Sequence, residues 1–510
     1  MFSKVNTCIL QGLKGYIVEV ETDISRGMPT FNIVGLPDIS IRESKERVRT
    51  ALKNCGYKFP LNRITVNLAP ANLKKEGSQI DLSIAVGILT SMGIIEKNNF
   101  NRYAFIGELS LDGRVNKIEG ALPIIISLRE LGIKTAIVPY DNKDECSVVD
   151  QINIIPVKNL KQLVDSLNGQ IKIPPYRKDI DNILKKDNIF EEDFSDIKGQ
   201  DSLKRALEVA AAGSHNIIIV GPPGSGKTMA ARRLPSILPR LTFEESIEIT
   251  KIYSVAGLLK NNSLGTKRPF RAPHHTASTT SLVGGGRIPK PGEVSLSHYG
   301  VLFLDELPEF KRDVLEVLRQ PMEDGMVTIS RINATLTYPS KFMLVASMNP
   351  CPCGYYGDPY HECTCSQRKI EQYLGKISQP LLDRIDIHME VMPVNYNDLK
   401  EEKVKTESSE TIRMRVDEAR NRQLQRYKED NIFSNSQLAP RNIRKYCKLD
   451  SGAEMIMREA FNRYKFSARS YNKILKVSRT IADLDAEEII KDRHILEAIQ
   501  YRSLDQKYWG

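Results

Sequence analysis

The stretch Ile217-Ile-Ile-Val-Gly-Pro-Pro-Gly-Ser-Gly-Lys-Thr228 decides how this chain folds. It opens with four β-branched residues, which are typical of a buried strand, and the helix-forming sequence Met-Ala-Ala-Arg-Arg-Leu follows it. A strand, a glycine-rich loop and a helix in this order indicate a phosphate-binding loop, or P-loop. We expect the loop to contact a nucleotide through Gly221, Pro222, Pro223, Gly224, Ser225, Gly226, Lys227 and Thr228.

The residue types of this loop indicate what it binds. Glycines allow backbone N–H groups to face a triphosphate, and the N-terminus of the following helix adds positive potential. Lys227 is expected to reach the β- and γ-phosphate oxygens, and the Thr228 hydroxyl to bind Mg²⁺. The pattern therefore predicts ATP and Mg²⁺ as cofactors.

A second apolar strand, Val301-Leu-Phe-Leu-Asp-Glu306, ends in two carboxylates. Strands that are apolar throughout are typical of buried parallel sheets, whose carboxyl ends carry the functional side chains. Asp305 is expected to hold Mg²⁺, and Glu306 to orient and deprotonate the attacking water. The pair is a weak signal by itself and becomes a strong one beside the P-loop.

Two further segments carry candidate catalytic residues. The apolar strand Phe342–Ser347 leads to Asn349, which could hydrogen-bond the γ-phosphate or the attacking water; the alternative is an ordinary turn residue. The segment Pro380-Leu-Leu-Asp-Arg-Ile-Asp-Ile387 places Arg384 beside an aspartate in a short turn before another strand. By itself this arrangement is more typical of a structural ion pair.

Composition limits the class of protein. With 510 residues the chain has room for about three domains of ~150 residues each, and its 41% hydrophobic and 27% charged residues exclude disordered and fibrous classes. Apolar runs such as Leu122–Leu128 are far shorter than the ~20 residues of a membrane span, and the N-terminal MFSKVNTCIL lacks the apolar segment of a signal peptide. We therefore expect a cytoplasmic protein with no membrane partner. The net charge of +10 favours a polyanionic partner.

Local patterns divide the chain into segments. Near the N-terminus, strand-like runs (Ile64–Leu68, Thr135–Pro139) alternate with helical ones (Ser83–Met92, Leu122–Leu131), and the charged segment NGQIKIPPYRKDIDNILKK then loses all periodicity. The C-terminal part is helical in pattern and poor in glycine and proline. We expect an α/β or α+β domain at 1–168, a linker at 169–192, an α/β P-loop core at 193–394 and a helical domain at 395–510.

Several longer stretches resemble one family. They are Arg271-Ala-Pro-His-His-Thr-Ala-Ser278, Leu304-Asp-Glu-Leu-Pro-Glu-Phe310, Asn349-Pro-Cys-Pro-Cys-Gly354, Leu381-Leu-Asp-Arg-Ile-Asp386 and Phe466-Ser-Ala-Arg-Ser-Tyr-Asn472. Together they resemble AAA+ ATPases of the magnesium-chelatase-like branch, which includes the ComM (YifB) family of competence-associated proteins. The resemblance covers essentially the whole chain.

The resemblance implies roles for three residues. Asn349 takes the position of sensor 1, Arg384 that of the arginine finger that completes the neighbouring subunit's site, and Arg469 that of sensor 2 on a helical lid. Because the finger acts on a neighbour, the resemblance implies a homo-oligomeric ring, which we expect to be a hexamer. A fixed cation in this place meets the charge that develops on the γ-phosphoryl group.

The resemblance also implies a DNA motor of the helicase or branch-migration type, which hydrolyses ATP and acts on single-stranded or branched DNA during recombination or natural transformation. Two alternatives remain. A magnesium-chelatase motor subunit would share the ATPase core. An ATP-dependent protease would share the N-terminal region, which resembles the Lon-protease-type domain in Lys75–Leu82 and Gly107–Val115.

The protease alternative lacks its catalytic pair. Aligning the glycines places Gln79 at the nucleophilic serine and Leu122 at the catalytic lysine, and neither can act as nucleophile or base. Ser78 is a register alternative, but the lysine is still missing. We expect a non-proteolytic domain that is structural or binds nucleic acid.

Basic residues suggest where DNA could bind. The segment Ser254–Gly300 resembles the helix-2 insert of this branch, and 323–338 resembles the hairpin before sensor 1; in related motors such loops line the pore. Candidate DNA contacts are Lys267, Arg268, Arg271 and Arg331, with a solvated surface as the alternative. Residues 441–479 contain eleven Lys and Arg against three Asp and Glu, with the same two interpretations.

Cysteine and histidine raise the question of further metals. The two C-x-C pairs formed by Cys351, Cys353, Cys363 and Cys365 could bind Zn²⁺ through four thiolates, or they could be reduced free thiols. The one-residue spacing departs from the usual zinc knuckle. The adjacent His274 and His275 are not expected to bind a metal, because neighbouring side chains point apart in most backbone conformations.

Overall fold

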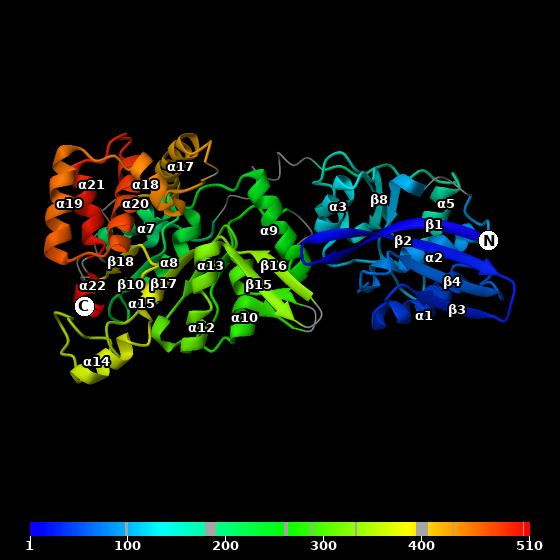
Figure 1. Cartoon of the computed structure of the whole chain (residues 1–510), viewed down its shortest axis with the longest axis horizontal. Helices are drawn as coiled ribbons and strands as arrows, with labels where there is room; N and C mark the ends of the chain where they lie inside the picture. The colour runs from blue at the N-terminus through cyan, green and yellow to red at the C-terminus, as the bar shows by residue number, and fades with distance from the viewer. Residues whose placement is uncertain are drawn as a thin grey trace. The chain divides into compact units, whose positions relative to one another are not determined.

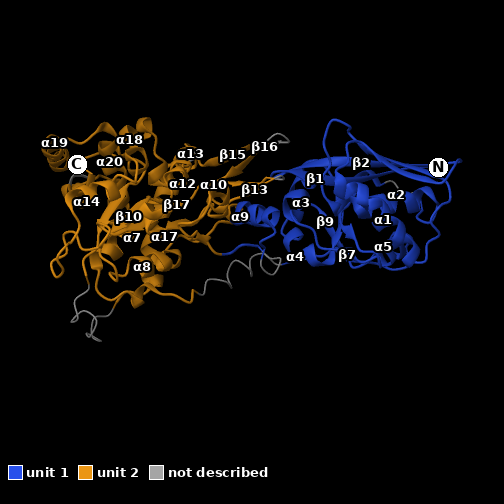
Figure 2. Ribbon diagram, turned by 90° about the horizontal axis from the view of Figure 1, so that it is seen from below, with its two compact units in different colours: residues 1–187, 246–266 blue, residues 188–245, 267–510 orange. Residues whose placement is uncertain are grey.

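The computed structural model describes residues 1–96, 100–178, 190–259, 264–286, 289–331, 334–393, 406–430, 432–502 and 504–509. The chain forms two compact units: Met1–Asp187 with Ser246–Thr266, and Asn188–Glu245 with Lys267–Gly510 (Figure 2). Residues 179–189 of the expected linker, and residue 395 where the helical domain is expected to start, lie outside the described residues. No helix in the described part of the chain is long and apolar enough to cross a membrane.

Unit 1 contains a mixed four-stranded sheet and a parallel three-stranded sheet. The four-stranded sheet runs in the order β1 (Phe2–Gln11), β2 (Lys14–Ser25), β4 (Arg63–Ala69), β3 (Thr30–Val34), and only β3 and β4 pair in parallel. The other consists of β5 (Tyr103–Phe105), β8 (Thr135–Pro139) and β9 (Asn153–Val157), and a small ribbon joins β6 (Glu108–Leu109) to β7 (Val115–Asn116). The helices are α1 (Ile39–Asn54), α2 (Asp81–Ser91), α3 (Ala121–Glu130), α4 (Lys143–Cys146) and α5 (Leu160–Leu167).

Unit 1 also includes most of helix α9 (Phe243–Ala256), far away in the sequence. The Ser254 hydroxyl donates to the buried Glu145 carboxylate at 2.8 Å, and the Gly120 N–H donates to the Ser254 carbonyl at 3.0 Å. Burial raises the pKa of Glu145, while hydrogen bonds from Asn142 and Ser254 oppose that shift. These buried polar contacts hold the second half of α9 within this unit.

Unit 2 is built on a parallel five-stranded sheet, of which Figure 1 labels the strands β10, β17 and β18. Its order is β11 (Phe270–Arg271), β14 (Val301–Leu304), β17 (Met343–Met348), β10 (Ile217–Val220), β18 (Ile387–Glu390). The three central strands are buried at every residue, as expected for a parallel sheet that is covered on both faces. Two antiparallel ribbons pair β12 (Gly284–Gly285) with β13 (Lys290–Pro291), and β15 (Met326–Arg331) with β16 (Ala334–Pro339).

One set of helices precedes or lies between the strands of the sheet, and a second set follows its last strand, β18. The former are α7 (Asp201–Gly213), α8 (Lys227–Arg233), α10 (Thr279–Val283), α11 (Glu293–Leu296), α12 (Arg312–Glu316), α13 (Arg319–Asp324), α14 (Gln367–Leu374) and α15 (Gln379–Leu382). The latter are α17 (Ser409–Arg426), α18 (Pro440–Tyr446), α19 (Ser451–Tyr464), α20 (Ala468–Leu484), α21 (Asp492–Gln500) and α22 (Leu504–Trp509).

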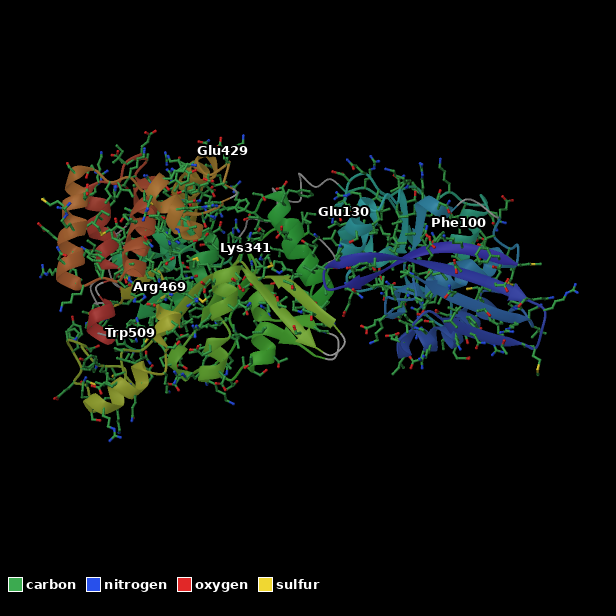
Figure 3. All side chains as sticks on the ribbon, in the orientation of Figure 1. Phe100, Glu130, Lys341, Glu429, Arg469 and Trp509 are labelled. Atoms are coloured by element: carbon green, nitrogen blue, oxygen red, sulfur yellow. The ribbon has the colours of Figure 1, made fainter. Side chains whose placement is uncertain are left out.

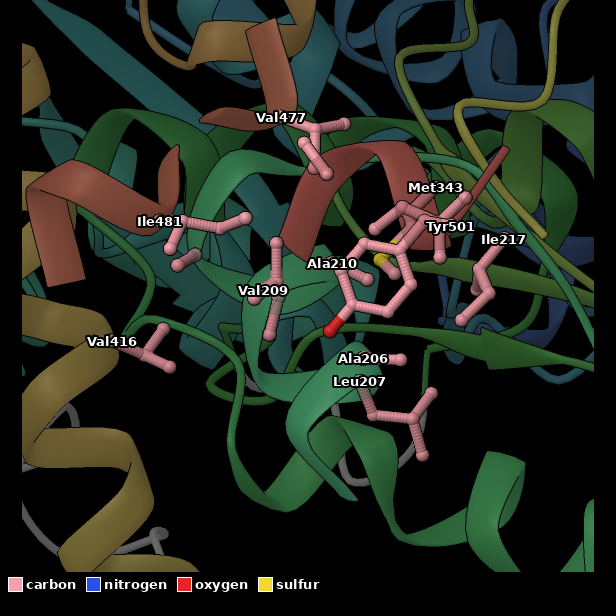
Figure 4. Packing of buried hydrophobic residues seen from close by; sticks show 14 of the residues in the cluster. Ala206, Leu207, Val209, Ala210, Ile217, Met343, Val416, Val477, Ile481 and Tyr501 are labelled. Carbon is pink, nitrogen blue, oxygen red and sulfur yellow. The ribbon is translucent and has the colours of Figure 1, made fainter. Parts of the chain in front are cut away.

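One hydrophobic core joins the sheet of unit 2 to its C-terminal helices. Figure 4 shows Val209 on α7 and Ile217 on β10 in the same cluster as Val416 on α17 and Ile481 on α20. Apolar burial on this scale is the main stabilising term in folding. The predicted fold class, an α/β P-loop core with a helical C-terminal region after an α/β domain, is confirmed.

Candidate nucleotide-binding site

The P-loop connects β10 to α8 at the carboxyl edge of the parallel sheet. Gly224 and Gly226 have φ angles of 77° and 87°, in the left-handed region that glycine adopts without steric cost. Lys227 is the first residue of α8, so the loop lies at a helix N-terminus. Its backbone is therefore shaped for an anion such as a phosphate group.

Lys227 is buried, and the structure brings it together with Asn349. Its ammonium group donates to the carbonyl oxygens of Gly221 at 2.7 Å and Pro222 at 2.8 Å, and to Asn349 Oδ1 at 3.3 Å. Burial lowers the pKa of Lys227 to about 8, although the charges of Asp305 and Glu306 oppose the shift. A buried cation that titrates near neutral pH is typical of functional sites.

This lowered pKa predicts a pH dependence of nucleotide binding. Only the protonated Lys227 attracts a triphosphate, and the free protein loses that proton as the pH rises through about 8. The Kd for Mg-ATP should therefore rise about tenfold between pH 7 and pH 9. Titration with a fluorescent ATP analogue across this range measures the effect.

The matched control is Lys227→Arg, whose guanidinium stays protonated throughout. Its affinity can differ from that of the natural protein, but it should not change between pH 7 and pH 9. A flat profile for the natural protein would contradict the link between the Lys227 proton and binding.

Asp305 follows β14 and lies against the P-loop helix. Thr228 Oγ1 donates to Asp305 Oδ2 at 2.8 Å, and the Ser347 hydroxyl donates to Oδ1. Carboxylate and hydroxyl oxygens are hard ligands of the kind that Mg²⁺ prefers. Thr228 and Asp305, the residues expected to hold Mg²⁺, are thus in contact. Ser347 places a third oxygen atom at this position, and the sequence did not predict it.

Glu306 lies at the open side of this site. Its side chain is 58% exposed, so water can reach the carboxylate, and its φ angle of 53° turns it away from the line of the strand. His275 Nδ1 lies 3.7 Å from Glu306 Oε2. His275, from the loop after β11, is therefore a neighbour of this carboxylate, a contact that no local sequence pattern indicated.

Arg384 lies in a different place from the P-loop. Its guanidinium pairs with Glu323 and donates to the Pro380 carbonyl at 2.8 Å. It lines a pocket of about 310 Å³ together with Glu316, Arg319, Gln320, Glu323 and Asp324. Among the residues that the structure describes, no hydrogen bond or ion pair joins Arg384 to residues 221–228.

Buried polar bonds hold the turn that carries Arg384. Asn216 Nδ2 donates to the Arg384 carbonyl at 2.9 Å, and His215 Nδ1 lies 3.0 Å from Asp386 Oδ2. Burial alone would raise the pKa of Asp386, but the hydrogen bond and charge of His215 hold it well below its usual range. From α20, Lys473 donates to the Ile385 carbonyl at 2.7 Å. These bonds fix the backbone from which the guanidinium extends.

Arg469 lies beside this turn. It is near the start of α20, where Figure 3 labels it. Its side chain is 72% exposed, and its guanidinium donates to Asp383 Oδ2 at 3.1 Å. Asp383 immediately precedes Arg384. The structure thus groups Arg469 with Arg384 rather than with the P-loop.

The candidate DNA contacts differ in their surroundings. Arg268 is largely buried and donates to the carbonyls of Pro239, Tyr299 and Arg240 and to the Glu245 carboxylate, which gives it a structural role. Arg271 forms a two-pronged ion pair with Glu293, at 2.5 and 2.7 Å. The Lys267 ammonium lies 5.3 Å from the centre of the Phe190 ring. Arg331 ends β15, and its side chain lies outside the described part of the structure.

The two C-x-C pairs converge. Sulfur–sulfur distances are 3.3 Å for Cys351–Cys353, 3.7 Å for Cys351–Cys363 and 3.6 Å for Cys353–Cys363, and all four sulfurs, including that of Cys365, lie within 4.8 Å of one another. Four sulfurs ~2.3 Å from a tetrahedral Zn²⁺ would be ~3.8 Å apart, so the cluster fits this ion. Backbone N–H groups of Tyr355 and Thr364 also donate to the Cys353 sulfur.

The residues at the protease positions of unit 1 form other contacts. Gln79 donates to the Glu76 carbonyl at 3.0 Å, and Leu122 is fully buried. The Ser78 hydroxyl donates to the Glu108 carboxylate. These contacts are compatible with a domain that does not cleave peptides.

Comparison with known proteins gives matches along most of the chain. The family described as magnesium chelatase, subunit ChlI, matches residues 193–399; the subunit ChlI family of Mg-chelatase matches residues 20–142, and its C-terminal family matches residues 406–502. Lon protease 2 of Bacillus subtilis is 29% identical over 170 residues, which cover 30% of each chain.

Full-length relatives are more similar. Competence protein ComM of Haemophilus influenzae is 42% identical over 497 residues, which cover 97% of this chain and 96% of that protein. The uncharacterized protein YifB of Escherichia coli is 40% identical over 506 residues, which cover 99% and 97%. The chain therefore belongs to the ComM/YifB family of magnesium-chelatase-like AAA+ ATPases.

Proposed function

We propose that the protein is a ring-forming motor that hydrolyses ATP to move along or remodel DNA. The observation that carries the ATPase part is the convergence of Lys227, Asn349, Thr228 and Asp305 at one edge of the sheet, with Glu306 beside them. In this proposal Lys227 and the P-loop amides hold the phosphates, and Thr228 and Asp305 hold Mg²⁺. Glu306 deprotonates the water, and Asn349 orients it or the γ-phosphate.

The position of Arg384 supports the proposed ring. In the described part of the chain its guanidinium forms no hydrogen bond or ion pair with the P-loop, and it pairs with Glu323 in an open pocket. We propose that Arg384 enters the nucleotide site of a neighbouring subunit as an arginine finger, and that Arg469, beside it, contributes to the same interface as sensor 2. A closed ring repeats this heterologous contact, and we propose a homohexamer.

DNA as the partner is supported by three observations. A relative covering nearly the whole chain is named a competence protein, the net charge is +10, and residues 441–479 are strongly basic. We propose single-stranded or branched DNA as the substrate, and helicase or branch migration in recombination or natural transformation as the role. Lys267 and Arg331 stay as candidate contacts, whereas the bonds of Arg268 and Arg271 favour structural roles.

We propose further that Zn²⁺ is a structural cofactor on Cys351, Cys353, Cys363 and Cys365, since their sulfur spacing fits a tetrahedral ion. Within unit 2 we distinguish an ATPase core, 193–394, from a helical lid, 395–510. The domain at 1–168 is proposed to be non-proteolytic, because Gln79 and Leu122 replace the catalytic pair.

DNA should stimulate the ATPase activity of the purified full-length protein. The expected result is faster ATP hydrolysis with forked or four-way DNA than without DNA, and a steep loss of this stimulation as salt rises, because binding releases counterions from the phosphates. A Glu306→Gln variant under the same conditions measures the ATP hydrolysis that does not come from the proposed site. ATPase activity that ignores every DNA and depends instead on a porphyrin-binding subunit would indicate a chelatase motor, and degradation of casein would indicate a protease.

A further inference from the structure

The turn that follows the first C-x-C pair is in contact with the P-loop. Gly354, directly after Cys353, has a φ angle of 89°, and a Cβ atom at this position would lie 2.6 Å from Cδ of Pro223 in the P-loop. The Gly354 N–H donates to the Cys351 carbonyl at 3.0 Å, so this glycine belongs to the turn formed by the first C-x-C pair. That turn therefore packs closely on the nucleotide loop.

The loop 351–366, which contains the four cysteines and is called the cysteine loop below, also packs against the C-terminal helix α22. The Tyr356 ring lies 6.4 Å from the Tyr508 ring, and Tyr508 on α22 donates to Glu390 at the end of β18 at 2.7 Å. A small cavity between the P-loop and the cysteine loop is lined by Gly221, Pro222, Gly354, Tyr356 and Tyr508, among others. The cysteine loop is thus layered between the P-loop and α22.

Residues 351–366 contain no helix or strand to hold this position. The four thiols bring Cys351 and Cys353 to Cys363 and Cys365, and the Asp358 carboxylate also accepts hydrogen bonds from the N–H groups of Tyr360 and His361. Closing such a loop costs conformational entropy, and a bound metal offsets that cost and fixes the loop.

We propose that Zn²⁺ on the four cysteines holds the Gly354 turn against Pro223 and thereby keeps the P-loop in its nucleotide-binding conformation. The inference rests on the proposed nucleotide and zinc sites and adds a coupling between them. Thermodynamic linkage makes the coupling reciprocal, so that bound nucleotide should also raise the affinity for the metal.

Removing the metal from the natural protein tests the coupling. Elemental analysis of the full-length protein should give about one Zn²⁺ per chain. After chelation, removal of the chelator and restoration of Mg²⁺, the Kd for a fluorescent ATP analogue should rise about tenfold, as expected if a tenth of the metal-free chains keep a competent P-loop. Adding Zn²⁺ should restore the original Kd.

Two variants separate the metal from the contact. Cys365→Ser should lose both the metal and nucleotide affinity, whereas Cys55→Ser, a half-buried thiol of unit 1, should lose neither. Gly354→Ala should keep the metal but weaken nucleotide binding, because its Cβ displaces the turn from Pro223.

The outcomes distinguish the coupling from the functions on which it rests. Zinc-loaded natural protein that binds no nucleotide would overturn the proposed nucleotide site. Natural protein that binds nucleotide but contains no zinc would overturn the metal site. Metal-free natural protein that binds nucleotide as tightly as the zinc-loaded form would overturn the coupling alone. This comparison uses only the natural protein, so it does not depend on whether a variant folds.

Discussion

Arg384→Ala should abolish ATP hydrolysis while leaving ATP binding intact. The guanidinium lies in a pocket with Glu323, and among the described residues it forms no hydrogen bond or ion pair with the P-loop. Removing it therefore leaves the local nucleotide contacts in place. Arginine fingers contribute roughly 10³- to 10⁵-fold to the rate in comparable systems, and we expect a loss of that order. Steady-state ATPase rates and the Kd for a fluorescent ATP analogue measure the two effects separately.

Mixed assemblies test whether Arg384 acts on a neighbour. Lys227→Ala should lose nucleotide binding but keep its finger, so mixing it with Arg384→Ala should restore activity at those interfaces where an intact P-loop meets an intact finger. Arg319→Ala is a matched control, because Arg319 lines the same pocket but pairs with Glu316 at 2.7 Å. Mixtures without any recovered activity would count against action between subunits.

Glu306→Gln should permit ATP binding and block turnover. The substitution keeps the shape of the side chain but removes the base that accepts the proton from water, a contribution of roughly 10²- to 10⁴-fold. Glu309→Gln is the control, because Glu309 belongs to the same acidic stretch but lies near Lys376, at 3.6 Å. Single-turnover hydrolysis of radiolabelled ATP measures the chemical step. Turnover at the natural rate in Glu306→Gln would disprove the assignment of the base.

Local sequence predicted the parts of the site that depend on short stretches. The β-branched run before the P-loop is strand β10 with the predicted bounds, and the apolar run before Asp305 is β14. The contact of Thr228 with Asp305 was also foreseeable, although 77 residues separate them, because parallel strands deliver their carboxyl ends to one edge. Hydrophobic runs and glycine-rich loops carry this information locally.

The order of the strands in the sheet is set by contacts between distant parts of the chain, and it places two site residues that the sequence did not predict. β17 lies between β14 and β10, and its register pairs Ala346 with Leu304. That pairing brings Ser347 to Asp305, a contact that nothing in the serine's own neighbourhood indicates. His275 likewise reaches Glu306 only because β11 lies beside β14.

Charge patterns were the least informative signal. Arg268 and Arg271 are basic residues in a polar segment, which is also the pattern of a DNA-contacting loop, yet both are bound to carboxylates of their own unit. Arg469 was expected on a helical lid, and its position beside Asp383 depends on how α20 packs against the turn of Arg384. Whether a cation is paired or available is decided by tertiary packing.

The most direct test of a nucleotide site shared between subunits and coupled to DNA is the ATPase rate per chain, measured against protein concentration with and without a four-way DNA junction. The account predicts that the rate per chain rises steeply as rings assemble, and that the junction raises it further and shifts assembly to lower concentration. A rate per chain that is the same at every concentration and unchanged by the junction would contradict it.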